Sequence, residues 1–466
     1  MKKARISAGL SAYRQIQLTI NESGLDYCIQ NKYEMMPEEI PSDIDMMYRN
    51  ADESFLDQLV IKVAKETRLL VTQKIVQGYY EYTYILSYPI PQKRFQLQLD
   101  FYSAISRKDY PNVMPAAVML ENKRFYKCFY VPDYFDELQY MFIRRTIKND
   151  MKPEHLEIAR QMYLHSPQEY DKRLEQVFGK EAAVLIKRCV DTLDCNIFEE
   201  NKTVFRKSVK AISQKNCASS KFQIMYRKFQ IFEVIPKRVI HKSGISVAFL
   251  SPDGGGKSTA IKAVSEQVSG SFYGNVELYF RPHYLSNAGS YKLYNKTSEE
   301  TTNTDPHGKK LNGKIKSFLR FSFYNLDFII GTWMKIIPLK IKKKLVIFDR
   351  YYYDYYADMA RYQYSLPTWV AKMFAWCIPS PNLIFVLDAP AEILYKRKQE
   401  LPIEELRKQR EAFKTFAENK RNAVLVDATQ DAKRVADSIT EKILRYKAEQ
   451  TAKLMHCALD DEGVPV

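Results

Sequence analysis

The second half of the chain alternates short apolar runs with longer helical segments. Ile245, Val247 and Phe249 alternate with Ser246 and Ala248, as residues of a β-strand do. The runs at 345–348 and 383–387 are wholly apolar, which is typical of parallel strands buried on both faces. We expect strands at 245–250, 276–280, 345–348, 383–387 and 423–426. The helical stretches between them predict an α/β domain over 244–450, built on a doubly wound parallel sheet.

The first half shows a different pattern. In 95–101, Phe95, Leu97 and Leu99 share one side of an expected strand that ends at Asp100. From 131 to 236 the apolar positions follow a helical period, as in Phe135, Leu138 and Phe142. We therefore expect an α+β domain over 1–130, a helical domain over 131–236, and a boundary in the polar, Pro-containing segment 235–243.

A glycine-rich segment follows the strand at 245–250. Residues 251–258 fit the pattern G-x-x-x-x-G-K-[ST], except that Ser251 replaces the first glycine. Three glycines let backbone N–H groups approach a phosphate chain, Lys257 adds a cation, and Ser258 offers a hydroxyl to Mg²⁺. We expect Lys257 to be solvated and to contribute little packing. The predicted nucleotide-binding residues are Ser251, Asp253, Gly254, Gly255, Gly256, Lys257, Ser258 and Thr259.

Polar residues follow three of the expected strands, where ligands bind in open α/β sheets. Arg281 follows 276–280, Asp349 and Arg350 follow 345–348, and Asp388 follows 383–387. The carboxyl ends of parallel strands meet at one edge, so these side chains should surround one site. A glycine-rich turn without a ligand is the alternative interpretation.

Three aspartates in the first half form a second candidate site. Asp43 and Asp45 lie two residues apart on an expected strand and so point to one face. Asp100 lies on the polar face of its own strand. Carboxylates on one face can hold a divalent cation, so Asp43, Asp45 and Asp100 are predicted metal ligands.

Chain length, net charge and cysteine content limit the classes of ligand and the cellular compartments that fit the sequence. The 466 residues exceed one core, and a net charge of +16 suits anionic ligands such as nucleotides, nucleic acid or an acidic membrane face. Seven scattered cysteines and the lack of an apolar leader favour a reducing cytoplasm. The apolar stretch 318–339 is interrupted by charges, so we expect no transmembrane segment. We expect it to be mainly core, with a surface amphipathic helix as the alternative, and Asp327 to act as a cap or substrate-side carboxylate.

The C-terminal motifs resemble the thymidylate kinase-like P-loop kinases. The resemblance rests on 252–259, 348–352, 386–390 and 426–429, which occur in the family's order. It implies a kinase that uses ATP and Mg²⁺, in which Ser258 and Asp349 contact the metal. Lys257, Asp349, Arg350 and a lid arginine would be catalytic, and Arg281 and Arg350 would bind the acceptor. For Arg350 the alternative is a structural role, in which it pairs with Asp349 or Asp354 and orders the strand end. Arg397, Arg407 and Arg410 are the lid candidates, with Arg397 preferred. Tyr352–Asp358 differs from the family's usual acceptor segment.

The N-terminal aspartates resemble those of the nucleotidyltransferase superfamily, where three carboxylates hold metals at a nucleoside triphosphate. Gln30 and Asn31 stand where that family has a Gly-Ser helix start. The two resemblances together are similar to fusion proteins of bacterial surface-polysaccharide gene clusters. They imply phosphoryl transfer to a nucleotide-like, sugar or polyol acceptor. A nucleic-acid end-processing enzyme and a non-catalytic nucleotide-binding scaffold are the alternatives.

Overall fold

The chain forms two compact units in a computed structural model that describes residues 2–78, 81–88, 96–107, 109–218, 242–285 and 313–466. The first unit contains the described residues up to 218 together with Ala448–Val466, and the second contains those from 242 to 447. The helical segment belongs to the same unit as the N-terminal sheet, although the sequence pattern predicts separate domains over 1–130 and 131–236. Phe95 and most of the expected boundary segment 235–243 lie outside the described residues.

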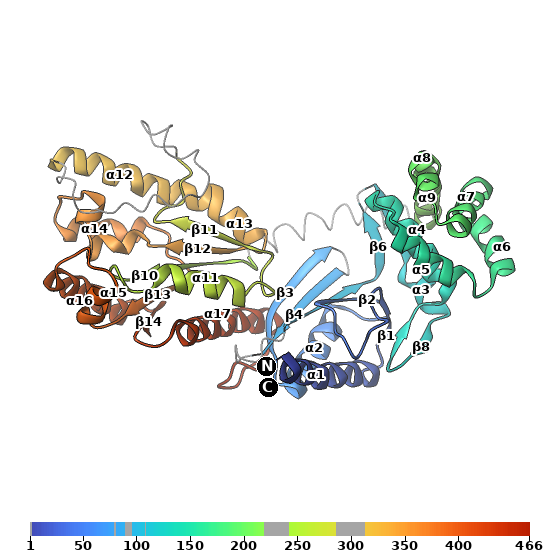
Figure 1. The fold of residues 1–466 in the computed structure, drawn as a ribbon, viewed down its shortest axis with the longest axis horizontal. Coiled ribbons are helices and arrows are strands. Elements are labelled where there is room, and N and C mark those ends of the chain that lie inside the picture. The colour runs from blue at the N-terminus through green and yellow to red at the C-terminus, as the bar shows by residue number, and fades with distance from the viewer. Residues whose placement is uncertain (1, 79–80, 89–95, 108, 219–241, 286–312) are drawn as a thin grey trace. The chain divides into compact units, whose positions relative to one another are not determined.

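The first unit is built on a mixed sheet with the strand order β1-β2-β5-β4-β3 (Figure 1). Strands β2 and β5 are parallel and the other pairs are antiparallel. Helices α1 and α2 pack on one face, and the Asp52 side chain caps α2 by accepting from the Phe55 N–H. The elements are α1 (Lys2–Glu22), β1 (Asp26–Gln30), β2 (Asp43–Arg49), α2 (Glu53–Thr67), β3 (Leu70–Gly78), β4 (Glu81–Ser87) and β5 (Gln96–Tyr102).

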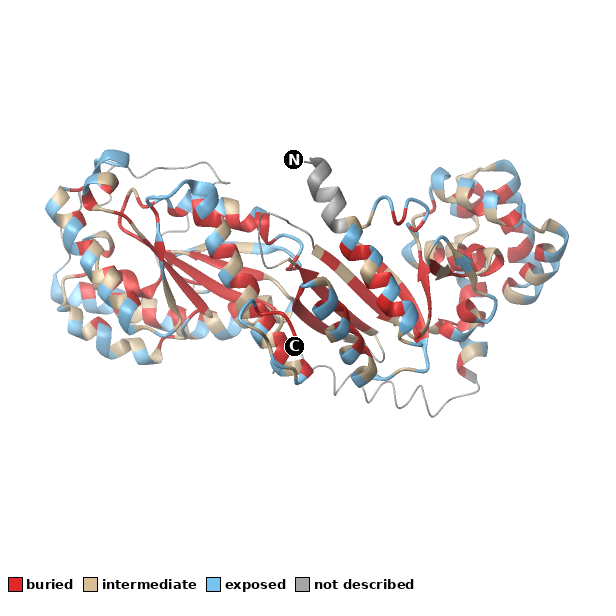
Figure 2. Cartoon of the chain, turned by 90° about the horizontal axis from the view of Figure 1, so that it is seen from below, coloured by how far each residue is buried: buried red, intermediate tan, exposed pale blue. Residues whose placement is uncertain are grey.

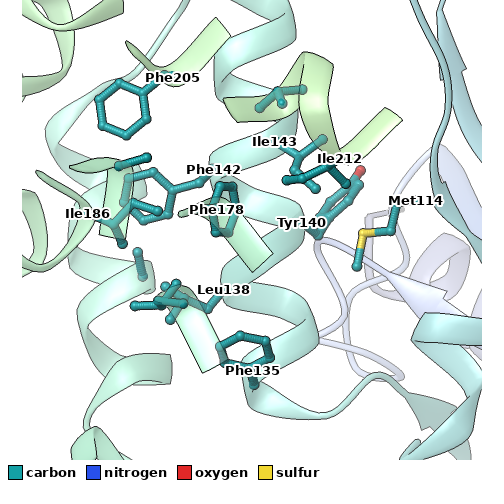
Figure 3. Packing of buried hydrophobic residues seen from close by; sticks show 14 of the residues in the cluster. Met114, Phe135, Leu138, Tyr140, Phe142, Ile143, Phe178, Ile186, Phe205 and Ile212 are labelled. Atoms are coloured by element: carbon teal, nitrogen blue, oxygen red, sulfur yellow. The ribbon is translucent and has the colours of Figure 1, made fainter. Parts of the chain in front are cut away.

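A group of helices with its own apolar cluster completes this unit. Figure 3 shows Phe142 of α4 between side chains of the neighbouring helices, and the Phe142 and Phe205 rings stack with centroids 6.2 Å apart. The helical period predicted from Phe135, Leu138 and Phe142 is therefore confirmed. The elements are β6 (Ala104–Arg107), β7 (Tyr110–Pro115), α3 (Ala116–Glu121), β8 (Arg124–Tyr126), β9 (Phe129–Val131), α4 (Tyr134–Lys148), α5 (Pro153–Tyr163), α6 (Pro167–Phe178), α7 (Lys180–Thr192), α8 (Cys195–Glu200) and α9 (Lys202–Ala218).

The second unit is a three-layer α/β structure with a five-stranded parallel sheet in the order β11-β12-β10-β13-β14. All five expected strands are present, and the first four residues of the predicted run 276–280 fall within β11. The central strands are buried on both faces and appear red in Figure 2. The strands are β10 (Ile245–Leu250), β11 (Asn275–Tyr279), β12 (Leu345–Asp349), β13 (Leu383–Asp388) and β14 (Ala423–Asp427).

Apolar clusters on the two faces of this sheet anchor different helices. Val247 and Phe385 face a cluster with Ile261 of α11, whereas Val346 faces a cluster with Phe328 of α12. The helical and turn elements are α11 (Lys257–Gln267), α12 (Lys314–Gly331), η2 (Thr332–Ile336), α13 (Ile337–Ile341), η3 (Tyr352–Tyr356), η4 (Ala360–Tyr362), α14 (Thr368–Phe374), η5 (Ala375–Cys377), α15 (Ala391–Arg397), α16 (Ile403–Asn419) and α17 (Ala432–Met455).

The stretch 318–339 agrees only partly with its expected place in the core. Phe321 and Phe328 are buried, as expected, but Phe318, Leu319 and Trp333 are exposed. Only one stripe of the helix reaches the sheet, because a single helix packed on a sheet buries one face. None of the helices in the described part of the chain has the length and apolar character needed to cross a bilayer.

Candidate functional site

The glycine-rich loop is shaped by close packing at its centre. A Cβ on Gly255 would lie 1.6 Å from the Ser251 Oγ, so no other residue fits without moving the loop. Gly256 has φ +80°, a conformation that favours glycine, and directly precedes α11. The first backbone N–H groups of a helix have no partner within the helix, so the start of α11 is suited to an anion.

A cavity of about 860 Å³ opens at this loop, at the carboxyl edge of the parallel sheet. Residues from several segments far apart in the sequence meet there, and Arg281, Asp349 and Arg350 lie there as their strand ends predicted. Asp388, at the end of β13, does not line the cavity and pairs with Arg410 instead, so the prediction that it joins this site is wrong. Ser251 also does not line the cavity and is fully buried. The predicted residues that do line it are Asp253, Gly254, Gly255, Gly256, Lys257, Ser258, Thr259, Arg281, Asp349, Arg350 and Arg397.

Lys257 is buried, and the expectation of a solvated lysine is wrong. Its Nζ donates to the carbonyl oxygens of Ser251 at 2.9 Å and Pro252 at 3.2 Å, which folds the side chain back along the loop. Burial, followed by the positive charge of Arg350, lowers the pKa of Lys257 to about 8. The ammonium is therefore part of the loop structure as well as a charge at the cavity.

Arg350 joins the glycine-rich loop to the end of β12. Its terminal nitrogens donate to Asp354 Oδ2 at 2.9 Å and to Asp253 Oδ1 at 2.6 Å, and all three side chains are buried. Arg361 also pairs with Asp253, and its Nε donates to Asp358 Oδ2 at 2.7 Å. These contacts form a buried ion network of Asp253, Arg350, Asp354, Arg361 and Asp358.

Asp253 is the carboxylate at the centre of this network. Burial opposes its ionisation, but Arg350, Lys257 and Arg361 together lower the pKa of Asp253 to about 2. The free-energy cost of removing these charged side chains from water is thus offset by attraction between close opposite charges. The network fixes the loop against the segment η3–η4.

Asp349 and Ser258 have the properties required of Mg²⁺ ligands. The Asp349 Oδ1 is buried and has no hydrogen-bond partner among the described residues, which is costly unless a ligand satisfies it. Ser258 is exposed at the cavity, in the first turn of α11. Both supply the oxygen donors that Mg²⁺ prefers. Among the described residues, however, no three His, Cys, Asp or Glu side chains form a group that could hold a metal alone.

Arg281 is held in place from behind the cavity by Asp327. The Arg281 NH1 lies 2.6 Å from Asp327 Oδ2, and Asp327 is fully buried. Asp327 also accepts from the backbone N–H groups of His283, Tyr284 and Leu285. Asp327 does not line the cavity, so its role is to anchor the segment after β11.

Aromatic side chains form the wall of the cavity beside Arg281. Phe280 and Tyr362 stack with ring centroids 4.1 Å apart, and the Arg281 guanidinium lies 5.0 Å from the Tyr324 ring centroid. Tyr279 also lines this wall. The wall offers apolar ring surface next to a fixed cation.

The three lid candidates lie in different surroundings. Arg397 ends α15, lines the cavity and donates to the Ala428 carbonyl at 3.0 Å. Arg407 is exposed and pairs with Glu392 and Glu404, and Arg410 pairs with Asp388 at 2.7 Å. The structure therefore brings only Arg397 of the three to the cavity.

Several lining residues were missed by the sequence analysis. Arg320, Tyr324, Arg361, Tyr362 and Lys398 all line the cavity. None lies in a motif or directly after a strand. Only one of them had a signal in the sequence: Lys398 lies in the basic segment 396–410. That segment also fits a solvated helix face, so the sequence did not single out Lys398.

The three N-terminal aspartates lie on one face of their sheet, as predicted. Asp45 is the direct cross-strand partner of Asp100, and Asp43 is opposite Gln98. Burial raises the pKa of Asp45 and that of Asp100, and Arg144 partly offsets the shift at Asp45. Asp100 accepts from Thr83 and from Gln98 Nε2, whereas Asp43 pairs with Lys32 at 3.2 Å. The predicted metal site at this face remains a prediction.

A second cavity of about 860 Å³ opens beside Asp43 and Asp45 within the first unit. Three cations of α4 also line this cavity, namely Arg144, Arg145 and Lys148, and the Arg144 NH1 lies 3.9 Å from Asp45 Oδ2. The charge of Arg144, together with burial, lowers the pKa of Lys148. Three cations that line one cavity are typical of an anion site.

Comparisons with known proteins do not assign the chain to a family. No protein-family model matches the sequence, and no significant match was found among curated proteins.

The ion network predicts a large stability effect of Asp253→Asn. The substitution leaves the buried guanidinium of Arg350 and the partly buried guanidinium of Arg361 without their shared carboxylate, which should cost the second unit about 3–5 kcal/mol. All three tryptophans lie in this unit, so their fluorescence during urea unfolding reports its free energy. Exposed Glu418→Gln, also in this unit, is the charge-matched control and should change little.

The pH dependence of this effect has a defined sign. Asp253 has a pKa below its ordinary value of 3.8, so its contribution is present above 3.8 and is lost as the pH falls toward about 2. The difference between the wild type and Asp253→Asn should shrink over that range. Equal unfolding midpoints for the two proteins at neutral pH would contradict the network's structural role.

Proposed function

We propose that the second unit is an ATP-dependent phosphotransferase that resembles the thymidylate kinases and acts on a small nucleotide-like, sugar or polyol acceptor. One observation carries the proposal. The glycine-rich loop, Lys257 and Asp349 meet at one cavity with several arginines, at the edge of a parallel sheet where such enzymes hold nucleotides.

The loop and Lys257 would bind the ATP phosphates. Backbone N–H groups at the start of α11 would receive the phosphate oxygens, and Lys257 would turn its ammonium from the loop carbonyls to the β/γ-phosphates. Ser258 and Asp349 would hold Mg²⁺, which neutralises charge on the phosphates when bound. Phosphoryl transfer needs mainly positioning and charge stabilisation, and these residues can provide both.

Arginines would divide the remaining roles. Arg281 is fixed by Asp327 beside the aromatic wall, which suits an acceptor that carries a phosphate next to a ring. Arg397, at the end of α15, lines the cavity and would contact the transferring phosphoryl group. Arg350 already pairs with Asp253 and Asp354, which favours a role in positioning the loop over direct phosphate contact.

Removal of the Lys257 ammonium should weaken ATP binding. Lys257→Ala deletes charge-assisted hydrogen bonds worth about 1.5–3 kcal/mol, so the Kd for ATP should rise by roughly 10- to 100-fold. Turnover should fall at least as far. Lys262→Ala, on the exposed face of the same helix, is the matched control and should bind normally. Calorimetric titration with ATP that gave equal affinity for both variants would refute the assignment of Lys257.

The same lysine predicts a pH dependence of ATP binding. With a pKa of about 8 in the free protein, Lys257 loses its charge above that pH, whereas a bound phosphate would keep it protonated. The Kd should therefore rise by up to about tenfold for each pH unit above 8. Lys257→Ala should lack this dependence, and an identical slope in that variant would show that another group is responsible.

The acceptor can be identified by transfer of labelled phosphate from γ-labelled ATP. We expect label on a nucleoside monophosphate, sugar or polyol from a panel that also contains oligonucleotides. Label on oligonucleotide 5′-hydroxyls, with binding that weakens steeply with salt, would instead support nucleic-acid end processing. ATP binding without transfer to any acceptor, and without ATP hydrolysis, would support a nucleotide-binding scaffold.

The first unit has a second candidate function, as a nucleotidyltransferase-like site. Asp43 and Asp45 line its cavity together with the cations Arg144, Arg145 and Lys148, and such a mixture of carboxylates and cations suits a metal-bound polyphosphate. Gln30 and Asn31 stand where the family has its Gly-Ser start, and the Asn31 side-chain amide lies 3.4 Å from Asp45 Oδ2.

This candidate predicts metal binding that depends on both aspartates. Calorimetric titration of Mg²⁺ in the presence of a non-hydrolysable nucleoside triphosphate should show a site lost in Asp43→Asn with Asp45→Asn. Exposed Asp461→Asn with Glu462→Gln, in the same unit, is the control pair. Lys257→Ala should be present in both proteins, so that binding in the second unit does not mask the result. Unchanged heat in the double aspartate variant would exclude the site.

A further inference from the structure

Helix α12 and the turn after it carry an apolar stripe that faces solvent. Phe321 and Phe328 pack toward the sheet, and the exposed residues lie on the opposite side of the helix at intervals of three, four and seven positions. The stripe runs for more than four turns. Its exposed apolar members are Ile315, Phe318, Leu319, Leu326, Ile330, Trp333 and Met334.

A neighbouring helix carries further exposed apolar residues. Helices α12 and α14 cover the same face of the sheet (Figure 1). Beneath their exposed sides, the ring centroids of Phe321 and Phe374 lie 5.7 Å apart. Ala371 of α14 is buried, whereas Trp369, Met373 and Trp376 point to solvent. The exposed side chains of α12, η2, α14 and η5 are called the tryptophan face below.

All three tryptophans of the chain lie on this face. Trp333, Trp369 and Trp376 are 66%, 62% and 83% exposed. Tryptophan is a large apolar residue, and contiguous exposed apolar area is unfavourable in water unless a partner covers it. Tryptophan is also the side chain most characteristic of the membrane–water interface, where its ring and N–H are both accommodated.

The charge of the tryptophan face has a single sign. The only carboxylate in 313–344 and 359–380 is Asp327, which is fully buried and held by Arg281. The same segments carry ten cations, of which Lys314, Lys316, Arg320 and Lys372 are exposed side chains of α12 and α14. Lys314, Lys316 and Lys372 are exposed among the apolar residues.

We propose that the tryptophan face binds the surface of an anionic lipid bilayer without crossing it. Apolar side chains flanked by lysines, on a helix parallel to the protein surface, match the pattern of interfacial membrane binding. The absence of exposed carboxylates from these two segments provides the charge complementarity to anionic headgroups. A second copy of the chain is a poorer partner, because a symmetric contact would place the same cations opposite one another.

Tryptophan fluorescence tests this directly, because every tryptophan reports from the face. Vesicles of phosphatidylcholine mixed with phosphatidylglycerol should shift the emission of the full chain to shorter wavelength and protect it from an aqueous quencher. Affinity should exceed that for phosphatidylcholine vesicles by at least about tenfold, as two lysines near an anionic surface would give. High salt should remove this difference.

Matched variants separate the tryptophan face from other apolar surface. Leu319→Ser with Met373→Ser should reduce cosedimentation with the anionic vesicles, and Lys314→Gln with Lys316→Gln should reduce the preference for anionic lipid. Leu164→Ser with Val184→Ser, at exposed apolar positions of the first unit, should change neither. Circular dichroism confirms that each variant is folded, and the test does not depend on kinase activity.

Three results would overturn the proposal. Emission and cosedimentation that do not respond to anionic vesicles would exclude lipid as the partner. A blue shift that grows with protein concentration in the absence of lipid would identify a second copy of the chain instead. Emission that is already blue-shifted and protected in dilute lipid-free protein would show that the chain itself covers the face.

Discussion

The ion pair between Asp253 and Arg350 connects two of the segments that line the cavity of the second unit. Asp253 belongs to the loop after β10, and Arg350 follows β12, so the pair joins adjacent strand ends through side chains. Both residues are buried, and each has a second partner of opposite charge. Without such partners the charges could not be buried, and the glycine-rich loop would not be fixed against η3–η4.

Different sides of helix α12 contact the sheet, the cavity and the solvent. Phe328 packs under the sheet, Asp327 holds Arg281 and the segment after β11, and Arg320 and Tyr324 line the cavity. The outward side carries the apolar stripe of the tryptophan face. If the outward side of α12 bound a membrane, the side of α12 that lines the cavity would lie close to that membrane. The proposed nucleotide site and the proposed lipid-binding face are therefore neighbouring surfaces of one helix.

The strands of the second unit and the residues at their carboxyl ends could largely be predicted from the sequence. Five parallel strands and the meeting of Asp253, Arg281, Asp349 and Arg350 at one edge follow from apolar runs and from the geometry of a parallel sheet. The shared face of Asp43, Asp45 and Asp100 follows from strand alternation and the register of β2 with β5.

The features that could not be predicted from the sequence depend on tertiary packing. The burial of Lys257 depends on loop carbonyls that fold around it, and no local pattern encodes that arrangement. Arg361 reaches the site because η3–η4 turns back toward the loop, although it lies far from Asp253 in sequence. The sequence left open whether the stretch 318–339 lies in the core or at the surface, because apolar residues at helical spacing do not reveal which side another layer covers.

Nucleotide binding by the glycine-rich loop can be tested with a structure of the chain bound to a non-hydrolysable ATP analogue and Mg²⁺. We expect the β- and γ-phosphates within hydrogen-bonding distance of backbone N–H groups of 254–258, with the Lys257 Nζ moved from Ser251 O to a phosphate oxygen and the metal beside Ser258 and Asp349. An analogue bound only in the cavity of the first unit, or bound in the second unit with its phosphates away from the loop, would refute nucleotide binding by this loop.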